Sequence, residues 1–493
     1  MARTAEPDAS GAGEPATGLG AVALARAMRD GWLDPVEHTE AVLELARTTG
    51  ALVGAFSHVA PEMSREQAAA ARTALREGRP GRLIGVPVPI KALAQVEGLP
   101  ADNGSTALRG EIADRTDGAA QDLLDAGTVT IGLTTVPELG MPCYTEPAGR
   151  TPARTPWDLR RTAGGSSGGA AAAVASGIVP IAHGSDGGGS IRIPAACCGI
   201  VGFKPSRGVV SPGPFGVEGP GLVTDGVLAR SVADIAVGMD AIARTRPGDA
   251  FGIELRGSFV DALAAARPGG LRIGVLTEPL AIDAPVHPAA LAAVQRAVEA
   301  LRAAGHRLDE VPRPFAPSQW RAFMPLWAAG AAAAELPGGA EEQLMPLTRW
   351  LREQGRACTG VAHARALADM QRVARTMGER YDGYDLILTP ALAQPPAFPE
   401  DLQLADPAAD FDAQCAFTPW TSTWNMTGRA AVAVPLHREA VDGVELPFGV
   451  QLGAVRAADD HLVLAVAAQL EERDPWPLIT EPRGATARDE GAR

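Results

Sequence analysis

Apolar runs typical of buried strands alternate with helix-like segments along most of the 493-residue chain. The first helical pattern spans residues 19–47 and is broken at Gly31 and Pro35. The other expected helices are residues 117–127, 166–177, 231–243, 287–305 and 458–473, and the expected strands are residues 128–135, 178–186, 271–277, 306–311, 384–392, 430–436 and 447–455. This alternation predicts an α/β fold with a largely parallel or mixed sheet.

Local signals divide the rest of the chain. Residues 1–18, rich in Pro, Gly and Ala, are expected to form a disordered lead, and residues 481–493 a flexible tail. Residues 310–382 lack strand patterns and are expected to form a helical insertion. Asp459 is the expected cap of the last helix, and Ser231 with Asp234 matches a capping box.

The charge balance excludes several classes of partner. The formal net charge is −14 and the isoelectric point is about 5.1, whereas nucleic-acid binding needs clustered positive charge. No apolar run approaches the roughly 20 residues of a membrane span, and the N-terminus lacks the apolar segment of a secretory signal. We therefore expect a cytoplasmic protein with neither a nucleic-acid nor a membrane partner.

The cysteine and histidine patterns predict neither disulfides nor metal. The five cysteines are an odd number, include the adjacent Cys197 and Cys198, and form no CxxC pattern. An HExxH motif is absent, and the histidines lack ligand spacing. Neither a metal nor a cofactor is expected.

The glycine- and serine-rich centre, residues 163–208, admits several interpretations. A phosphate loop would need a GK[ST] or a GxGxxG between a strand and a helix, and neither is present. A nucleophile elbow at Gly164-x-Ser166-x-Gly168 or Gly165-x-Ser167-x-Gly169 would need an apolar strand directly before it. The charged stretch "WDLRRTA" precedes it instead.

A third interpretation starts from "GSDGGGSIRIP". Gly187, Gly188 and Gly189 place three residues without side chains directly before Ser190. Backbone N–H groups in such a run can converge beside the serine hydroxyl, which is what an oxyanion hole requires. A flexible linker fits poorly, because the following "SIRIPAACCGIVGF" is apolar. Ser190 is therefore a candidate nucleophile that needs a base.

Together these motifs resemble the amidase signature family of serine hydrolases. The resemblance rests on "AGGSSGGAAAAVASG" followed by "GSDGGGSIRIPAACCGIVGFKPSRG", on "GVPVPIKAL" upstream, and on "YDLILTPAL" and "NMTGRAAVAVPL" downstream. It covers most of residues 19–475, and is strongest toward bacterial amidases that include 6-aminohexanoate-cyclic-dimer hydrolase. It implies the amidase signature fold, a large mixed β-sheet covered by helices on both faces, in one domain over residues 19–480.

The resemblance also implies a Ser–cis-Ser–Lys triad. It assigns the nucleophile to Ser190, the bridging serine to Ser166 and the lysine to Lys91, with a cis peptide between Gly165 and Ser166. The implied oxyanion donors are the backbone amides of Gly187, Gly188, Gly189 and Ser190, and the implied substrate contacts are Met141, Cys143 and Gly165. Two positions depart from the family pattern: Ala92 replaces the usual Asp, and Ala170 a frequent Ser.

Lysine is rare here, which gives this assignment physical weight. Only Lys91 and Lys204 occur among the 44 basic residues. An amine accepts a proton only when neutral, so a base must fall from a pKa of about 10.4 to about 7–8, which burial can achieve. Arginine, at about 12.5–13.8, stays charged. Lys204 is expected to be structural, Asp186 and Arg192 to brace the nucleophile loop, and His183 to be a core residue.

The expected activity is hydrolysis of a carboxamide in a small-molecule substrate through an acyl-serine intermediate. Two alternatives remain open. One is an amidotransferase subunit that acts with partner proteins, and the other is a non-catalytic amidase-like scaffold. A homodimer is a possible assembly state.

Overall fold

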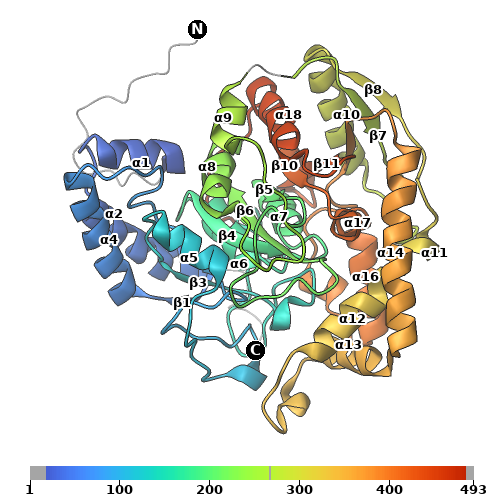
Figure 1. Ribbon diagram of the computed structural model, residues 1–493, viewed down its shortest axis with the longest axis horizontal. Helices are drawn as coiled ribbons and strands as arrows, with labels where there is room; N and C mark the ends of the chain where they lie inside the picture. Colours follow the sequence, from blue (N-terminus) through green and yellow to red (C-terminus); the bar gives the residue numbers. More distant parts are fainter. Residues whose placement is uncertain (1–17, 266–267, 485–493) are drawn as a thin grey trace.

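The computed structural model describes residues 18–265 and 268–484 (Figure 1). The expected disordered lead lies outside these residues except for Gly18, and the expected tail lies outside them from residue 485 onward. In the described part, no helix is both long and apolar enough to cross a membrane.

The strands form two sheets. The strands are β1 (Phe56–Val59), β2 (Ile90–Lys91), β3 (Gly132–Thr134), β4 (Ile181–Asp186), β5 (Val201–Lys204), β6 (Thr224–Ala229), β7 (Arg272–Val275), β8 (Arg307–Glu310), β9 (Leu386–Pro390), β10 (Ala431–Val441) and β11 (Val444–Ala454). The small sheet has the order β1-β3-β2, and the eight-stranded sheet has the order β4-β6-β5-β10-β11-β9-β7-β8.

Helices surround both sheets. They are α1 (Ala21–Arg29), α2 (Pro35–Arg47), α3 (Thr49–Leu52), α4 (Pro61–Arg76), α5 (Gly118–Asp125), α6 (Gly168–Ala175), α7 (Arg192–Cys198), α8 (Val232–Ile242), α9 (Phe259–Ala264), α10 (Pro288–Ala303), α11 (Pro317–Trp320), α12 (Phe323–Ala333), α13 (Pro346–Ala357), α14 (Gly360–Arg380), α15 (Pro399–Leu402), α16 (Pro407–Phe417), α17 (Thr421–Thr427) and α18 (Asp460–Arg473). Short 3₁₀ helices cover Thr106–Leu108, Glu138–Gly140 and Ala340–Gln343.

The large sheet is mixed, which confirms that part of the expectation. Strand β7 pairs in parallel with β8 and β9, whereas β4, β5, β6, β10 and β11 join their neighbours antiparallel. The long hairpin of β10 and β11 at the centre accounts for much of the antiparallel character, because a short turn can join only antiparallel strands.

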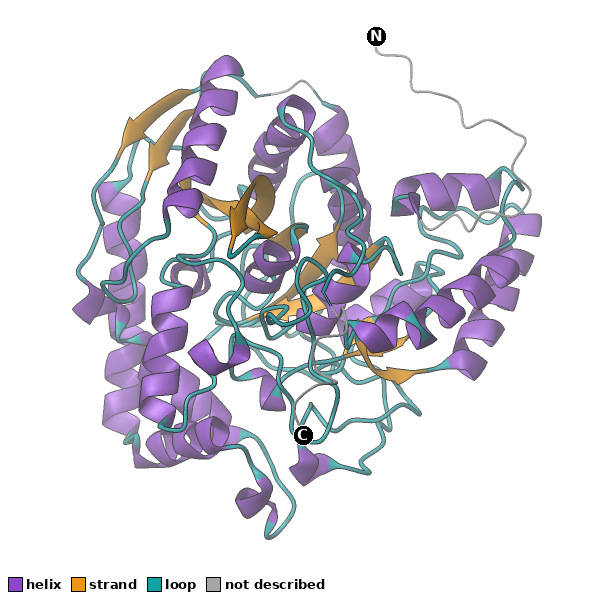
Figure 2. Cartoon of the chain, turned by 180° about the vertical axis from the view of Figure 1, so that it is seen from behind, coloured by secondary structure: helices purple, strands orange, loops and turns teal. Residues whose placement is uncertain are grey.

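Both faces of the large sheet are buried. On β9, Leu386 and Leu388 pack in one core cluster with α10, whereas the intervening Ile387 packs in another with α14. Successive side chains of a strand point to opposite faces, so a strand covered on both sides reads as the continuous apolar run seen in the sequence. Figure 2 shows the strands in the interior with helices outside them.

The small sheet is short because of its prolines. The stretch "GVPVPIKAL" contributes only the two residues of β2, at the edge of the sheet, and its N-terminal part meets residue 129 through an isolated bridge at Pro87. Proline donates no N–H to a ladder, which confirms the irregular, edge-strand prediction for this stretch. Its last residue in the strand, Lys91, is fully buried.

Two helix ends differ from their expected caps. The Ser231 hydroxyl does cap α8, but the Asp234 carboxylate accepts the N–H of Val22 in α1 instead of completing a capping box. Asp459 lies at the N-cap of α18 without a side-chain cap bond. In the first case a partner distant in sequence replaces the local one.

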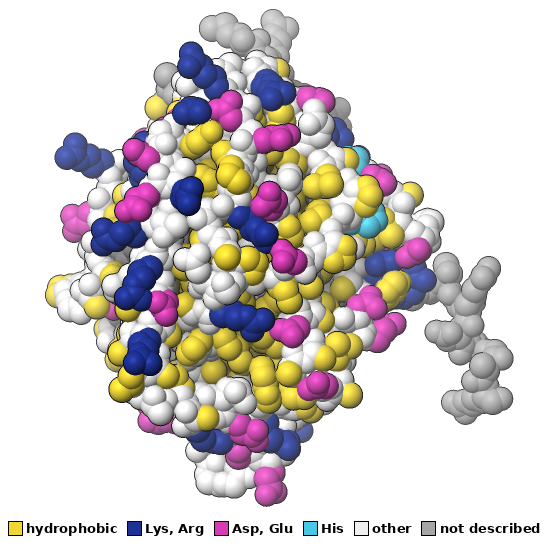
Figure 3. Space-filling view, turned by 90° about the vertical axis from the view of Figure 1, so that its right-hand side faces the viewer, with side chains coloured by type: hydrophobic (Ala, Val, Ile, Leu, Met, Phe, Trp, Pro, Cys, Tyr) yellow, Lys and Arg dark blue, Asp and Glu magenta, His cyan; other side chains and the backbone are white. Residues whose placement is uncertain are grey.

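The region between β8 and β9 is helical in the described chain, as predicted. Helices α12, α13 and α14 pack together beside α16 and α17 (Figure 1). On the face in Figure 3, basic side chains are interspersed with acidic ones. Mixed charge of this kind is typical of a solvated surface.

Candidate active site

The candidate site forms where three parts of the chain meet. Lys91 ends β2 of the small sheet, Ser166 precedes α6, and Ser190 lies between β4 of the large sheet and α7. The His183 N–H of β4 donates to the Pro89 carbonyl at 3.1 Å, which holds the two sheets together at this point. The fold thus brings residues 91, 166 and 190 to one place.

The Lys91 amine is held between a hydroxyl and a carbonyl. Its Nζ lies 2.9 Å from Ser166 Oγ and 2.8 Å from the Ser185 carbonyl oxygen. Burial lowers the pKa of Lys91 to about 7, against the opposing pull of the Asp186 and Asp225 carboxylates. At neutral pH a large fraction of this amine is therefore uncharged.

His183 supports Lys91 from the side. The Lys91 backbone N–H donates to His183 Nδ1 at 3.3 Å, and His183 Nε2 lies 3.3 Å from Asp225 Oδ1. Because Nδ1 accepts a hydrogen bond, the imidazole proton belongs on Nε2, facing the carboxylate. The histidine is a buried positioning group, as expected for a core residue.

The two serines lie on one cavity. Ser166 and Ser190 both line a space of about 220 Å³, and the Gly165–Ser166 peptide is cis. In the described structure no hydrogen bond joins the two hydroxyls, so the transfer between them stays a prediction. The Ser167 N–H donates to the Ser190 carbonyl at 3.1 Å and ties the two segments together.

The glycine run supplies fewer free donors than predicted. The Gly189 N–H donates to Asp186 Oδ1 at 2.8 Å, so this amide is not available to an oxyanion. The N–H groups of Gly187, Gly188 and Ser190 have no acceptor among residues 18–265 and 268–484. Gly189 needs its glycine for another reason, because its φ is +133°.

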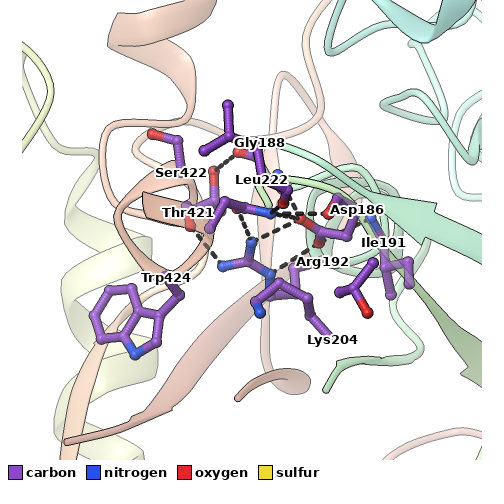
Figure 4. Close-up of polar contacts among 12 residues, drawn as sticks. Asp186, Gly188, Ile191, Arg192, Lys204, Leu222, Thr421, Ser422 and Trp424 are labelled. Carbon is purple, nitrogen blue, oxygen red and sulfur yellow. Dashed lines mark hydrogen bonds and ion pairs between the residues drawn. The ribbon is translucent and has the colours of Figure 1, made fainter. Parts of the chain in front are cut away.

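A buried ion pair fixes the loop that carries Ser190 (Figure 4). Arg192 Nη2 and Nε donate to Asp186 at 2.8 and 3.0 Å, and the Ile191 N–H donates to the same carboxylate at 3.1 Å. Burial raises the pKa of Asp186, but the Arg192 guanidinium outweighs it and holds that pKa well below its usual range. This confirms the predicted bracing role of Asp186 and Arg192.

Helix α17 completes the network with residues that sequence reasoning missed. The Asn425 amide donates to the Asp186 carbonyl at 2.8 Å, and its oxygen accepts from Arg192 at 2.7 Å. Thr421 Oγ1 donates to the Gly188 carbonyl at 2.8 Å (Figure 4). The only sequence signal was that Asn425 belongs to the "NMTG" segment, which by itself gives no role.

The expected substrate contacts divide. Met141 and Cys143 line cavities that contain Ser190. Gly165 lines neither of these, and a Cβ there would lie 2.8 Å from Tyr144 backbone atoms. The expectation for Gly165 is therefore wrong, because close backbone packing explains this glycine.

Other features lie outside the site. Lys204 Nζ donates to the Pro205 carbonyl at 2.8 Å, consistent with the structural role expected of it. A groove of about 1050 Å³ between α4 and α8 contains none of the predicted site residues. All five cysteines are free, and the described residues contain no group of three or more His, Cys, Asp or Glu side chains that could hold a metal.

Comparisons with known proteins agree with this geometry. The family model for Amidase matches residues 37–464. A putative amidase of Synechocystis is 34% identical over 465 residues, covering 92% of this chain and 88% of the relative. One component of the glutamyl-tRNA(Gln) amidotransferase of Deinococcus radiodurans is 35% identical over 482 residues, covering 92% of this chain and 96% of that one.

The fold also matches a solved enzyme structure. The structure of 6-aminohexanoate cyclic dimer hydrolase complexed with substrate superposes with a TM-score of 0.85 at 28% identity. The match covers 95% of this chain and 99% of that one. Both the sheet and the surrounding helices are therefore shared along nearly the whole length.

Proposed function

The chain belongs to the amidase signature family, and from this we propose that it cleaves a carboxamide through a covalent intermediate on Ser190. Ser166 is the bridging hydroxyl and Lys91 the base. The observation that carries the proposal is the fully buried Lys91 amine, 2.9 Å from Ser166 Oγ with a pKa of about 7. A base of this pKa is matched to reaction at neutral pH.

Acylation requires two proton transfers. The neutral Lys91 amine accepts the Ser166 proton while Ser166 Oγ accepts that of Ser190, and Ser190 Oγ bonds to the amide carbon. The electron pair displaced to the carbonyl oxygen is stabilised by N–H groups of Gly187, Gly188 and Ser190, each worth about 3 kcal/mol. The C–N bond then breaks as the leaving nitrogen takes a proton from Ser166, which Lys91 restores.

Deacylation repeats the route with water. Water loses a proton to the Ser166–Lys91 pair and attacks the acyl carbon, and the Ser190–acyl bond breaks as Ser190 Oγ regains a proton. The balance is amide plus water giving carboxylic acid plus amine. The Asp186–Arg192 network keeps the donors in place, so no reorganisation is needed during the reaction.

A fluorophosphonate probe tests the proposal. We expect one adduct per chain, located at Ser190 by peptide mass spectrometry, and no adduct in Ser190→Ala. Ser57→Ala, at a serine on β1 away from the site, is the matched control and should label fully. Absence of label on folded wild-type protein would instead support a non-catalytic scaffold. Ammonia release from glutamine that depends on partner protein and tRNA would support an amidotransferase role, as in the Deinococcus relative.

Hydrolysis should depend on the protonation of Lys91. Its pKa is about 7, and only the neutral amine accepts a proton, so kcat/KM should rise with pH through about 7 and level off above it. Below the midpoint we expect a fall of about tenfold per pH unit. The measurement is kcat/KM for one uncharged amide between pH 5.5 and 9.

Asp225→Asn provides a directional control for that profile. The Asp225 carboxylate raises the pKa of Lys91, so its removal should move the acidic limb to lower pH. A limb that moves to higher pH, or that does not move at all, would contradict the assignment of the limb to Lys91.

A further inference from the structure

Two cavities meet at Ser190. The first, here called the aromatic cavity, has a volume of about 60 Å³ and is lined by residues that include Trp320, Phe323, Phe411 and Cys415. The second, here called the Ser166 cavity, has a volume of about 220 Å³ and contains Ser166. Ser190, Met141 and Trp327 line both. An amide bound at Ser190 therefore has unequal room on its two sides.

The aromatic cavity offers no counter-charge. Its lining contains no Asp, Glu, Lys, Arg or His. Its polar side chains already have partners: Gln414 Oε1 accepts the Cys143 N–H at 2.7 Å, and Gln414 Nε2 donates to Asp410. The Thr418 hydroxyl donates to the Gln414 carbonyl at 2.9 Å, and Ser422 Oγ accepts from Trp320 at 2.8 Å. A charged group placed here would lose its hydration without replacement.

A flat wall of rings faces the glycine run. The Trp320 and Phe323 rings stack at 5.4 Å and 21°, and Phe323 and Trp327 at 5.3 Å and 23°. A Cβ on Gly187 would lie 2.9 Å from the Trp327 ring, and one on Gly188 would lie 3.3 Å from Phe323. The wall thus packs directly on the predicted oxyanion donors and leaves a narrow apolar space beside them.

The chemistry decides which half of the substrate enters which cavity. Ser166 delivers the proton to the leaving nitrogen, and it lines only the larger cavity. The amine half must therefore lie in the Ser166 cavity, and the acyl half in the aromatic cavity. The one charged residue of the larger cavity, Glu218, accepts the N–H groups of Ala250 and Phe251 at 3.1 Å each, so this side is also mainly apolar.

We propose that the substrate is an uncharged amide with a small, flat, apolar acyl group in the aromatic cavity and a larger apolar amine in the Ser166 cavity. This inference rests on the proposed acyl-serine reaction at Ser190. It goes beyond that reaction by assigning an orientation and a substrate class.

A panel of para-nitroanilides tests the acyl side. We expect kcat/KM for the benzoyl compound to exceed that for the similarly sized, negatively charged succinyl compound by at least about 100-fold, because no group compensates the buried carboxylate. The para-phenylbenzoyl compound should be slower than the benzoyl compound by at least about tenfold, since the cavity is short. Equal or better turnover of the succinyl compound would overturn the inference and leave the proposed reaction intact.

A matched pair of variants tests the orientation. Phe411→Ala, at a half-buried residue of the aromatic cavity, should raise the para-phenylbenzoyl to benzoyl ratio of kcat/KM about tenfold or more. Val223→Trp, at a residue of the Ser166 cavity that is 55% exposed, should lower the ratio of benzoyl nitroanilide to benzamide by a similar factor. Each variant should leave the other ratio unchanged.

The outcomes separate two kinds of failure. Exchange of the two effects, with Phe411→Ala altering amine preference and Val223→Trp altering acyl preference, would overturn the orientation. If neither variant moves its own ratio, the cavity assignment is wrong. Absence of turnover across the panel, together with absence of an acyl adduct on Ser190, would overturn the proposed function and this inference with it.

Discussion

Lys91→Arg is expected to remove amide hydrolysis near neutral pH while the protein stays folded. Burial lowers the pKa of the lysine to about 7, but a guanidinium starts at about 12.5–13.8 and remains protonated. Without a base the Ser166 hydroxyl cannot pass on a proton, and we expect kcat/KM to fall about a thousandfold or more. The measurement is turnover of an uncharged amide at pH 7–8, with circular dichroism to verify folding.

Lys204→Arg is the matched control for this loss. Lys204 is equally buried, and burial also lowers its pKa to about 7, but its amine donates to a backbone carbonyl and not to a serine. Turnover per folded molecule should stay within a few-fold of wild type. Similar losses in both variants would show that a buried guanidinium disturbs the fold, and retained activity in Lys91→Arg would exclude Lys91 as the base.

Asp186→Ala should destabilise the protein by about 3–5 kcal/mol. Arg192 and Asp186 both have fully buried side chains, so removal of the carboxylate leaves a guanidinium charge without its partner. The Gly189 and Ile191 N–H groups would lose their acceptor as well. The measurement is the midpoint of urea unfolding relative to wild type.

Asp369→Ala provides the comparison for an exposed ion pair. Asp369 pairs with Arg372 on α14, where both side chains are largely exposed, so its removal should change stability by no more than about 1 kcal/mol. A loss for Asp186→Ala no greater than that for Asp369→Ala would contradict the role given to the buried pair.

Local patterns predicted most of the framework. Periodicity located α1 and α2 on either side of the break at Gly31, and the prolines before Lys91 predicted an edge strand. The glycine run before Ser190 pointed to the oxyanion region without knowledge of its partners. These signals depend on neighbours within a few residues, which is why one chain without its fold reveals them.

Contacts between distant segments could not be predicted in the same way. The ring wall of Trp320, Phe323 and Trp327 lies more than a hundred positions from the glycines that it covers, and no periodicity links the two. The Gly189 N–H was expected to be free, but Asp186 takes it because the loop folds back on the end of β4. The sequence thus indicated the chemistry of the site better than its shape.

The placement of Lys91 on the small sheet makes catalysis a reporter of assembly. Its amine meets Ser166 only when the N-terminal layer is seated against the large sheet, where His183 of β4 donates its N–H to Pro89. A nascent or partly opened chain therefore carries both serines without a proton acceptor beside them. Loss of contact between these layers would silence the enzyme while most of its core stayed closed.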